Sequence, residues 1–202
     1  MHMENHRFVL VGVGGQGTLL ASHLLAEIGL SLGLDVKKAE IHGMSQRGGS
    51  VVSNVVWGKP VFSPVVGEGE ADTLIAFEKL ETLRYLPLLK PSGAIFVNDH
   101  EIEPITVSAG KQIYPNNADI EATLHKFTTK VFWIPANQIA EDLGSARVAN
   151  TVMIGVVLKG LGVELDYGVR TLEKTIQSRY LELNLRALKA GYDWLAISNH
   201  KG

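Results

Sequence analysis

Two glycine-rich segments carry the side chains of this sequence that could act on a ligand. Residues 12–17 read Gly-Val-Gly-Gly-Gln-Gly, and residues 40–52 read Glu-Ile-His-Gly-Met-Ser-Gln-Arg-Gly-Gly-Ser-Val-Val. Glycines at this density let a backbone turn tightly and approach a ligand closely. Arg47 offers a planar set of donors to a phosphate or carboxylate, and His42 could exchange a proton. We expect both segments to face one crevice, which predicts a ligand-binding or catalytic chain.

The first glycine loop, residues 12–17, fits the pattern G-x-G-x-x-G between an apolar run and a helical pattern. Such a loop brings backbone N–H groups and a helix N-terminus to an anionic group. The predicted ligand-binding residues of this loop are Gly12, Gly14, Gly15, Gln16 and Gly17. Three interpretations remain open: a dinucleotide site with Glu40 as the acidic partner, a site for another phosphate-bearing ligand, or a purely structural tight turn.

The second glycine loop, residues 43–49, contributes Gln46, Arg47 and Gly48. We predict that Arg47 and Gly48 belong to the cofactor-binding set, and that His42, Gln46 and Arg47 are the catalytic candidates. Each also has a structural interpretation. Arg47 could pair with a carboxylate, His42 could be a structural hydrogen-bonding group, and the glutamines could tie one loop to the other.

Composition restricts the function classes. The chain has 202 residues, 46% of them hydrophobic and 20% charged, a net charge of −2 and no cysteine. A folded core is therefore expected, while disulfides and an iron–sulfur cluster held by this chain alone are excluded. No basic stretch suggests nucleic acid, no apolar run is long enough for a membrane span, and no signal peptide is evident, so we expect a cytoplasmic protein. The sequence also lacks zinc, serine-hydrolase and P-loop motifs, and we predict no metal site.

Hydrophobic periodicity predicts an α/β chain with a Rossmann-like, mostly parallel sheet, helices on both faces and a helical C-terminal segment. The predicted strands are residues 7–11, 36–41, 50–57, 71–77, 94–97 and 131–134, with a possible edge strand at 113–115. The predicted helices are residues 18–32, 78–89, 118–125, 136–143 and 149–161, and two segments within 169–196 joined near 178–181. Residues 90–93 would end the second helix. We expect one domain over residues 1–202, with a flexible start at 1–6 and a helical part at 146–202.

Several segments of the chain resemble the gamma-type domain of 2-oxoacid:ferredoxin oxidoreductases, in particular the small subunit of the indolepyruvate branch. The two glycine segments carry the resemblance, and Gly-Met-Ser-Gln-Arg-Gly-Gly is its specific part. Further support comes from residues 71–78, 93–98, 150–155 and 184–191, which follow in the expected order. The resemblance therefore spans nearly the whole chain.

This resemblance implies a non-autonomous subunit. The family's complete enzyme decarboxylates a 2-oxoacid on thiamine diphosphate, passes electrons through iron–sulfur clusters to ferredoxin and forms an acyl-coenzyme A and CO2. The thiamine diphosphate and the clusters would belong to a large alpha subunit, because this chain has neither a Gly-Asp-Gly thiamine motif nor a cysteine. The gamma-type domain would shape the active-site crevice and the coenzyme A side, with an aryl pyruvate such as indolepyruvate as the expected substrate.

Two other functions remain open at this stage. One is a stand-alone dinucleotide-binding oxidoreductase, and the other is a regulatory binding module of the same fold. Because a permanent partner covers a broad apolar surface, the isolated chain could also pair with a second copy of itself.

Overall fold

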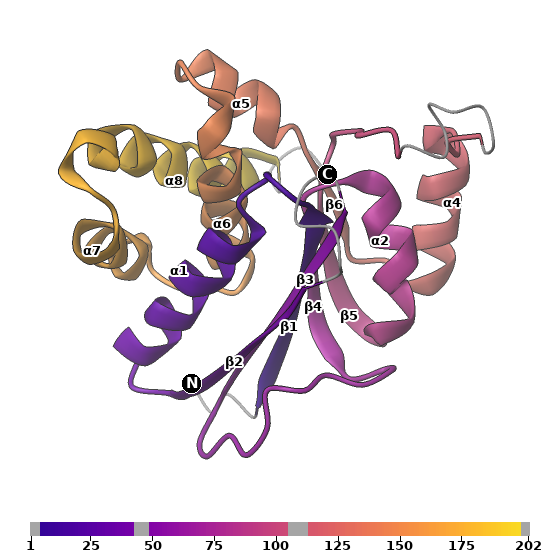
Figure 1. The fold of residues 1–202 in the computed structure, drawn as a ribbon, viewed down its shortest axis with the longest axis horizontal. Coiled ribbons are helices and arrows are strands. Elements are labelled where there is room, and N and C mark those ends of the chain that lie inside the picture. Colours follow the sequence, from indigo (N-terminus) through magenta and orange to yellow (C-terminus); the bar gives the residue numbers. More distant parts are fainter. Residues whose placement is uncertain (1–4, 43–48, 105–112, 199–202) are drawn as a thin grey trace.

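The computed structural model describes residues 5–42, 49–104 and 113–198, which form a six-stranded sheet with helices on both faces (Figure 1). The strands are β1 (His6–Val13), β2 (Asp35–His42), β3 (Ser50–Gly58), β4 (Ala71–Ala76), β5 (Leu89–Asn98) and β6 (Val131–Ile134). Their order is β2-β3-β1-β4-β5-β6. Five of these strands run in one direction and β3 runs against them, which confirms the prediction of a mostly parallel sheet.

The position of β3 decides where the two glycine loops meet. It forms a hairpin with β2 and then pairs antiparallel with β1, so it lies between the two strands of the first strand–helix–strand unit. Val13 at the end of β1 is opposite Ser50 at the start of β3, and His42 at the end of β2 is opposite Val51. The ends of β1 and β2 and the start of β3 therefore share one edge of the sheet.

Five helices and one short helical turn gather on one side of the sheet. They are α1 (Thr18–Ser31), α5 (Ala136–Asp142), η2 (Ala146–Val148), α6 (Ala149–Gly160), α7 (Leu165–Thr175) and α8 (Ser178–Ser198). All residues of α6 from 149 to 158 are buried, so it is the central helix of this layer. Helices α6 and α8 approach at backbone distance: a Cβ on Gly155 would lie 2.1 Å from Leu188 O, and one on Gly191 would lie 2.0 Å from Val152 O.

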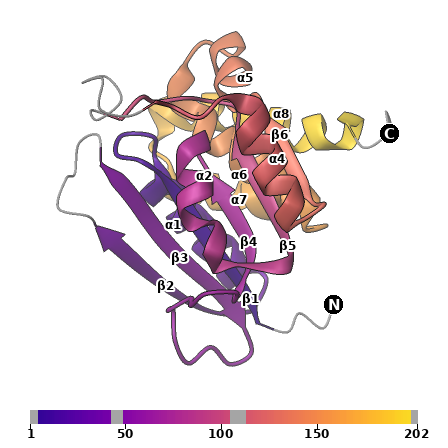
Figure 2. The same cartoon turned by 90° about the vertical axis from the view of Figure 1, so that its right-hand side faces the viewer.

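The other side of the sheet is covered by α2 (Lys79–Tyr85), the turn η1 (Leu86–Leu88) and α4 (Asn117–Phe127), with α2 and α4 in front of the sheet in Figure 2. Each face has its own apolar core. Phe8, Leu10 and Trp57 belong to the core beneath α1 and α6, while Val9 and Val11 belong to the core beneath α2 and α4. This alternation along β1 is the pattern of a strand buried on both faces.

The predicted strands and helices are confirmed except for the possible edge strand at 113–115, and three boundaries are corrected. The helix expected over 78–89 ends at Tyr85, and residues 90–93, expected to stop it, belong to β5, which already pairs with β4 at Leu89. Residues 113–115 do not form a strand. The junction between the last two helices lies at residues 176–177, before the expected 178–181. Within the described part of the chain, no helix has the length and apolar character needed to cross a membrane.

Candidate functional site

The turn between β1 and α1 requires glycine at two positions. Gly15 has φ +107° and Gly17 has φ +80°, both in the region that side chains other than glycine rarely adopt. Gly17 also lies directly under Asn150 of α6, because a Cβ on Gly17 would be 2.3 Å from Asn150 Nδ2. Asn150 Nδ2 donates a hydrogen bond to Gly17 O at 3.3 Å, so α6 holds the loop in place.

Gln16 fixes the same loop to the sheet. Its Oε1 accepts from Val13 N at 2.8 Å, and its Nε2 donates to Phe77 O at 2.7 Å, where the chain leaves β4. A Cβ on Gly12 would lie 2.9 Å from both Gln16 Oε1 and Thr18 Oγ1. Gly12 and Gln16 thus have packing and tethering roles in the structure, and ligand contacts by them stay a prediction.

The first glycine loop contacts the residue that precedes β3. Gly14 N donates to Gly49 O at 2.9 Å, which joins the first loop to the last residue of the second. This contact places Gly14 and Gly49 at the same edge of the sheet. Gln46, Arg47 and Gly48 lie outside the described residues, as does the side chain of His42, so their predicted roles stay predictions.

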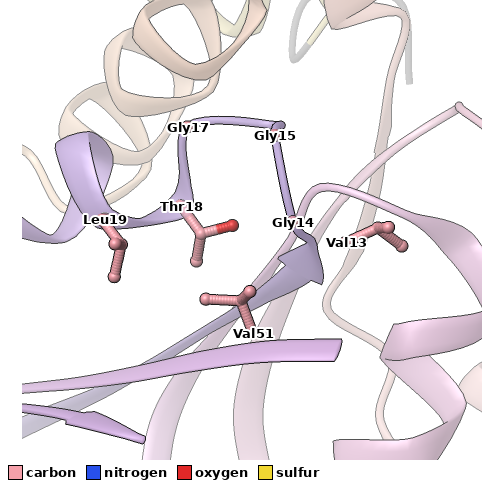
Figure 3. A pocket seen from close by; sticks show the side chains of 7 residues that line it. All are labelled: Val13, Gly14, Gly15, Gly17, Thr18, Leu19 and Val51. Carbon is pink, nitrogen blue, oxygen red and sulfur yellow. The ribbon is translucent and has the colours of Figure 1, made fainter. Parts of the chain in front are cut away.

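A hollow of about 420 Å³ opens between the first loop, the start of α1 and Val51 of β3 (Figure 3). Thr18 lines it, exposes 3% of its surface, and has a hydroxyl with no hydrogen-bond partner among the described residues. Helix α1 has no side-chain N-cap and no acidic residue in its first turn. Among the described residues, no carboxylate of the first turn and no side-chain cap compensates the positive end of its dipole, which favours an anionic group at this place.

A second hollow of about 490 Å³ lies on the other flank of the loop. Gly15, Gln16 and Gly17 line one side of it. The other sides include Phe77, Asn98 at the end of β5, His100 shortly after it, Asn137 of α5, Arg147 and Asn150. Its lining combines glycine and apolar residues with four side-chain amides, one histidine and one arginine.

Asn98 shows how the sheet end positions this wall. Its Nδ2 donates to Phe77 O at 3.1 Å and to Asn137 Oδ1 at 2.8 Å, and its Oδ1 accepts from Ala136 N at 3.1 Å. The strand predicted over 94–97 ends one residue before Asn98, but the sequence analysis misses Thr18, Asn137 and Arg147. The available signals are weak: Thr18 is the first residue after the glycine loop, and Arg147 precedes the apolar helix α6.

Lys79 is a cation near the same edge that is already neutralised. Its Nζ lies 2.6 Å from Asp99 Oδ1 and 2.8 Å from Glu101 Oε1, and it donates to Asn117 Oδ1 at 2.8 Å. Burial lowers the pKa of Lys79, but the hydrogen bonds and charges of Asp99 and Glu101 outweigh burial and raise it. This ammonium therefore stays charged and paired.

Ser50, which begins β3, is anchored to α2. Its Oγ donates to Glu81 Oε2 at 2.5 Å and lies 3.0 Å from the Tyr85 hydroxyl, while Arg84 Nη1 donates to Glu81 Oε1 at 2.6 Å. Burial raises the pKa of the Glu81 carboxyl, against the lowering effects of Ser50 and Arg84. The end of the second glycine loop is thereby held on the side of the sheet opposite α1.

The described residues contain no cluster of three or more histidine, aspartate or glutamate side chains that could hold a metal ion. Since the sequence has no cysteine, this chain offers no thiolate ligand for an iron–sulfur cluster. The chemistry that this edge of the sheet supports is anion binding by backbone donors, a hydroxyl and an arginine.

Comparison with known proteins gives consistent matches along the chain. The model of the family "Pyruvate ferredoxin/flavodoxin oxidoreductase" matches residues 7–194. The chain is 39% identical over 187 residues to an indolepyruvate oxidoreductase subunit IorB of Archaeoglobus fulgidus, covering 92% of each chain. It is 34% identical over 192 residues to the IorB subunit of Pyrococcus horikoshii, covering 94% of this chain and 95% of that one.

A solved structure shows the same fold. The gamma subunit of a keto/oxoacid ferredoxin oxidoreductase from Geobacter sulfurreducens superposes with a TM-score of 0.69 at 22% identity, over 95% of this chain and 99% of that one.

Proposed function

The chain belongs to the pyruvate ferredoxin/flavodoxin oxidoreductase family, and on this premise we propose that it is the small subunit of an indolepyruvate-type 2-oxoacid:ferredoxin oxidoreductase. The complete enzyme breaks the bond between the carboxylate and oxo carbons of an aryl pyruvate. CO2 leaves, two electrons pass to ferredoxin, and the acyl group is transferred to the sulfur of coenzyme A. The two relatives named as indolepyruvate oxidoreductase subunits match this chain almost end to end, which supports this branch of the family.

The chain does not work alone in this proposal. Thiamine diphosphate, which would supply the electron sink for decarboxylation, and the iron–sulfur clusters that would carry the electrons would be held by a larger alpha subunit. Ferredoxin meets the assembled complex, which we expect to act in the cytoplasm. The absence of cysteine supports this division of labour, because this chain cannot supply a thiolate ligand to a cluster.

The contribution of this chain is the coenzyme A side of the crevice. One observation carries this assignment: the uncapped N-terminus of α1, with the buried and unpartnered Thr18 hydroxyl beside it, opens at the first glycine loop. Phosphates of coenzyme A are anions that such an end binds through backbone N–H groups. Arg47, in the adjoining second loop, is the predicted side-chain partner of a phosphate.

Co-expression with the candidate large subunit tests the proposal. The complex is purified through a tag on this chain and assayed for dye reduction that depends on indolepyruvate and coenzyme A. Activity that requires both chains supports the subunit assignment. An assembled complex that is inactive on aryl pyruvates would retain the family and refute the substrate, while failure of the two chains to associate would refute the assignment.

The role of Arg47 is tested separately in the assembled enzyme. Arg47→Ala is expected to raise the KM for coenzyme A, because a charge-assisted hydrogen bond to a phosphate is lost. An unchanged KM for coenzyme A would remove that role from Arg47.

A further inference from the structure

Arg147, at the start of the helical C-terminal part, lines the second hollow with a cation that has no partner among the described residues. It belongs to the turn η2, lines the hollow together with Gly15 and Gly17, and is exposed. Its backbone N–H donates to Ser145 Oγ at 3.4 Å, but its guanidinium has no hydrogen bond or ion pair with any other described residue. Arginine donors that are not used within a chain are available for an external anion.

The surroundings of Arg147 also favour an anion. Of the described residues that line the second hollow, none is an aspartate or glutamate. Lys79, the other cation described near this edge, is already paired with Asp99 and Glu101. Arg147 is therefore the positive side chain of this hollow that remains to be neutralised.

An independent observation comes from the other flank of the same loop. The N-terminal turn of α1 has no side-chain cap. Thr18 at its start exposes only 3% of its surface, and its hydroxyl has no hydrogen-bond partner among the described residues. Figure 3 shows this oxygen turned into the space under the loop. An unpaired buried hydroxyl costs free energy, which an acceptor at this place would recover.

We propose that Arg147 and the N-terminal turn of α1 form a phosphate-binding subsite for coenzyme A. This inference rests on the proposed function and adds a residue from a distant part of the chain to it. Donors on both flanks of the loop suit a ligand with more than one anionic group. Coenzyme A carries a diphosphate and a 3′-phosphate, whereas a 2-oxoacid carries a single carboxylate.

The test uses the co-expressed complex with Arg147→Ala, the conservative Arg147→Lys and the control Arg186→Ala. Arg186 is an exposed arginine of α8 that makes no ion pair with the described residues and lines neither hollow. Arg147→Ala is expected to raise the KM for coenzyme A roughly tenfold, the size of one charge-assisted hydrogen bond, with kcat and the KM for the 2-oxoacid little changed. Calorimetric titration of coenzyme A into the complex, without 2-oxoacid, is expected to show the same factor in Kd.

Two further variants and a coenzyme A analogue identify which phosphate Arg147 binds. Arg147→Lys is expected to recover part of the affinity, and Arg186→Ala to match the parent. If Arg147 binds the 3′-phosphate, dephospho-coenzyme A will bind parent and Arg147→Ala equally; if it binds the diphosphate, the difference will persist. Both results support the subsite.

Two outcomes would overturn the subsite. One is an unchanged coenzyme A KM and Kd in Arg147→Ala within an active complex. The other is a raised KM for the 2-oxoacid alone, which would assign the anion to a carboxylate. In either case activity of the parent complex leaves the proposed function intact, whereas a parent complex without activity would refute the proposed function itself.

Discussion

Replacing Gly17 by alanine tests how the first glycine loop is held. The substitution places a Cβ on a residue with φ +80° and 2.3 Å from Asn150 Nδ2. Gly15→Ala is the matched control, since Gly15 has φ +107° but nothing lies within 4 Å of its Cβ position. Both variants carry backbone strain, and only Gly17→Ala collides with α6.

The expected magnitudes follow from these contacts. Left-handed backbone strain costs about 1–2 kcal/mol in either variant. Gly17→Ala must also displace the Asn150 side chain and break its hydrogen bond to Gly17 O, which adds about 1–2 kcal/mol. For a chain of this length, each kcal/mol lowers the Tm by roughly 2–4 °C. Gly17→Ala is therefore expected to melt several degrees below Gly15→Ala.

Thermal unfolding followed by circular dichroism measures the difference, and the double variant Gly17→Ala/Asn150→Ala completes the cycle. Because Asn150→Ala removes the colliding side chain, the double variant is expected to lose less stability than the sum of the single variants. Equal Tm values for Gly17→Ala and Gly15→Ala, together with additive losses, would refute the contact between the loop and α6.

Three further predictions concern titration and packing. Burial raises the pKa of Glu81 in the folded chain, so the stability that the protonated carboxyl contributes is lost as pH rises from the ordinary carboxyl pKa through the raised one. The Tm of Glu81→Gln minus that of the parent should therefore increase between about pH 5 and 8, and a difference that falls with rising pH would contradict this. Burial lowers the pKa of His6, so the folded state loses stability as pH falls through the ordinary histidine range. The Tm of His6→Gln should therefore fall less than the Tm of the parent between about pH 7 and 5. An equal fall in the two proteins would show that His6 does not contribute. Gly191→Ala should lower the free energy of unfolding by about 3 kcal/mol or more, because its Cβ would lie 2.0 Å from Val152 O. A loss below about 1 kcal/mol, measured by urea unfolding, would show that α6 and α8 can separate.

Local patterns in the sequence were sufficient for most of the fold. The apolar run of β1, the glycine turn and the spacing of Leu24, Leu25 and Ile28 predict the first strand, loop and helix, because each depends on neighbouring residues. Residues 90–93 misled the prediction, since Pro91 and Gly93 are typical of a break, yet this stretch continues a strand that starts with a pairing of Leu89 to Ala71. That pairing is between distant parts of the chain and has no local signal.

The residues of the candidate site likewise divide into those with a local sequence signal and those without one. The two glycine loops could be found from composition, and their contact at Gly14 and Gly49 agrees with the strand ends on which they lie. Arg147 and Asn150 reach the first loop only because α6 packs beside α1 on the same face of the sheet, although they lie 130 or more positions along the chain from Gly17. No periodicity or motif encodes that approach, so the cation of the second hollow is evident only in the folded chain.

Titration of this chain into the separately purified large subunit tests the central claim most directly. The rate of indolepyruvate- and coenzyme A-dependent dye reduction is followed at a fixed concentration of the large subunit. The account predicts no coenzyme A-dependent rate from either chain alone, and a rate that rises with added small chain and levels off at equal molar amounts. A large subunit that runs at its full rate without this chain, or a small chain that is active by itself, would contradict it.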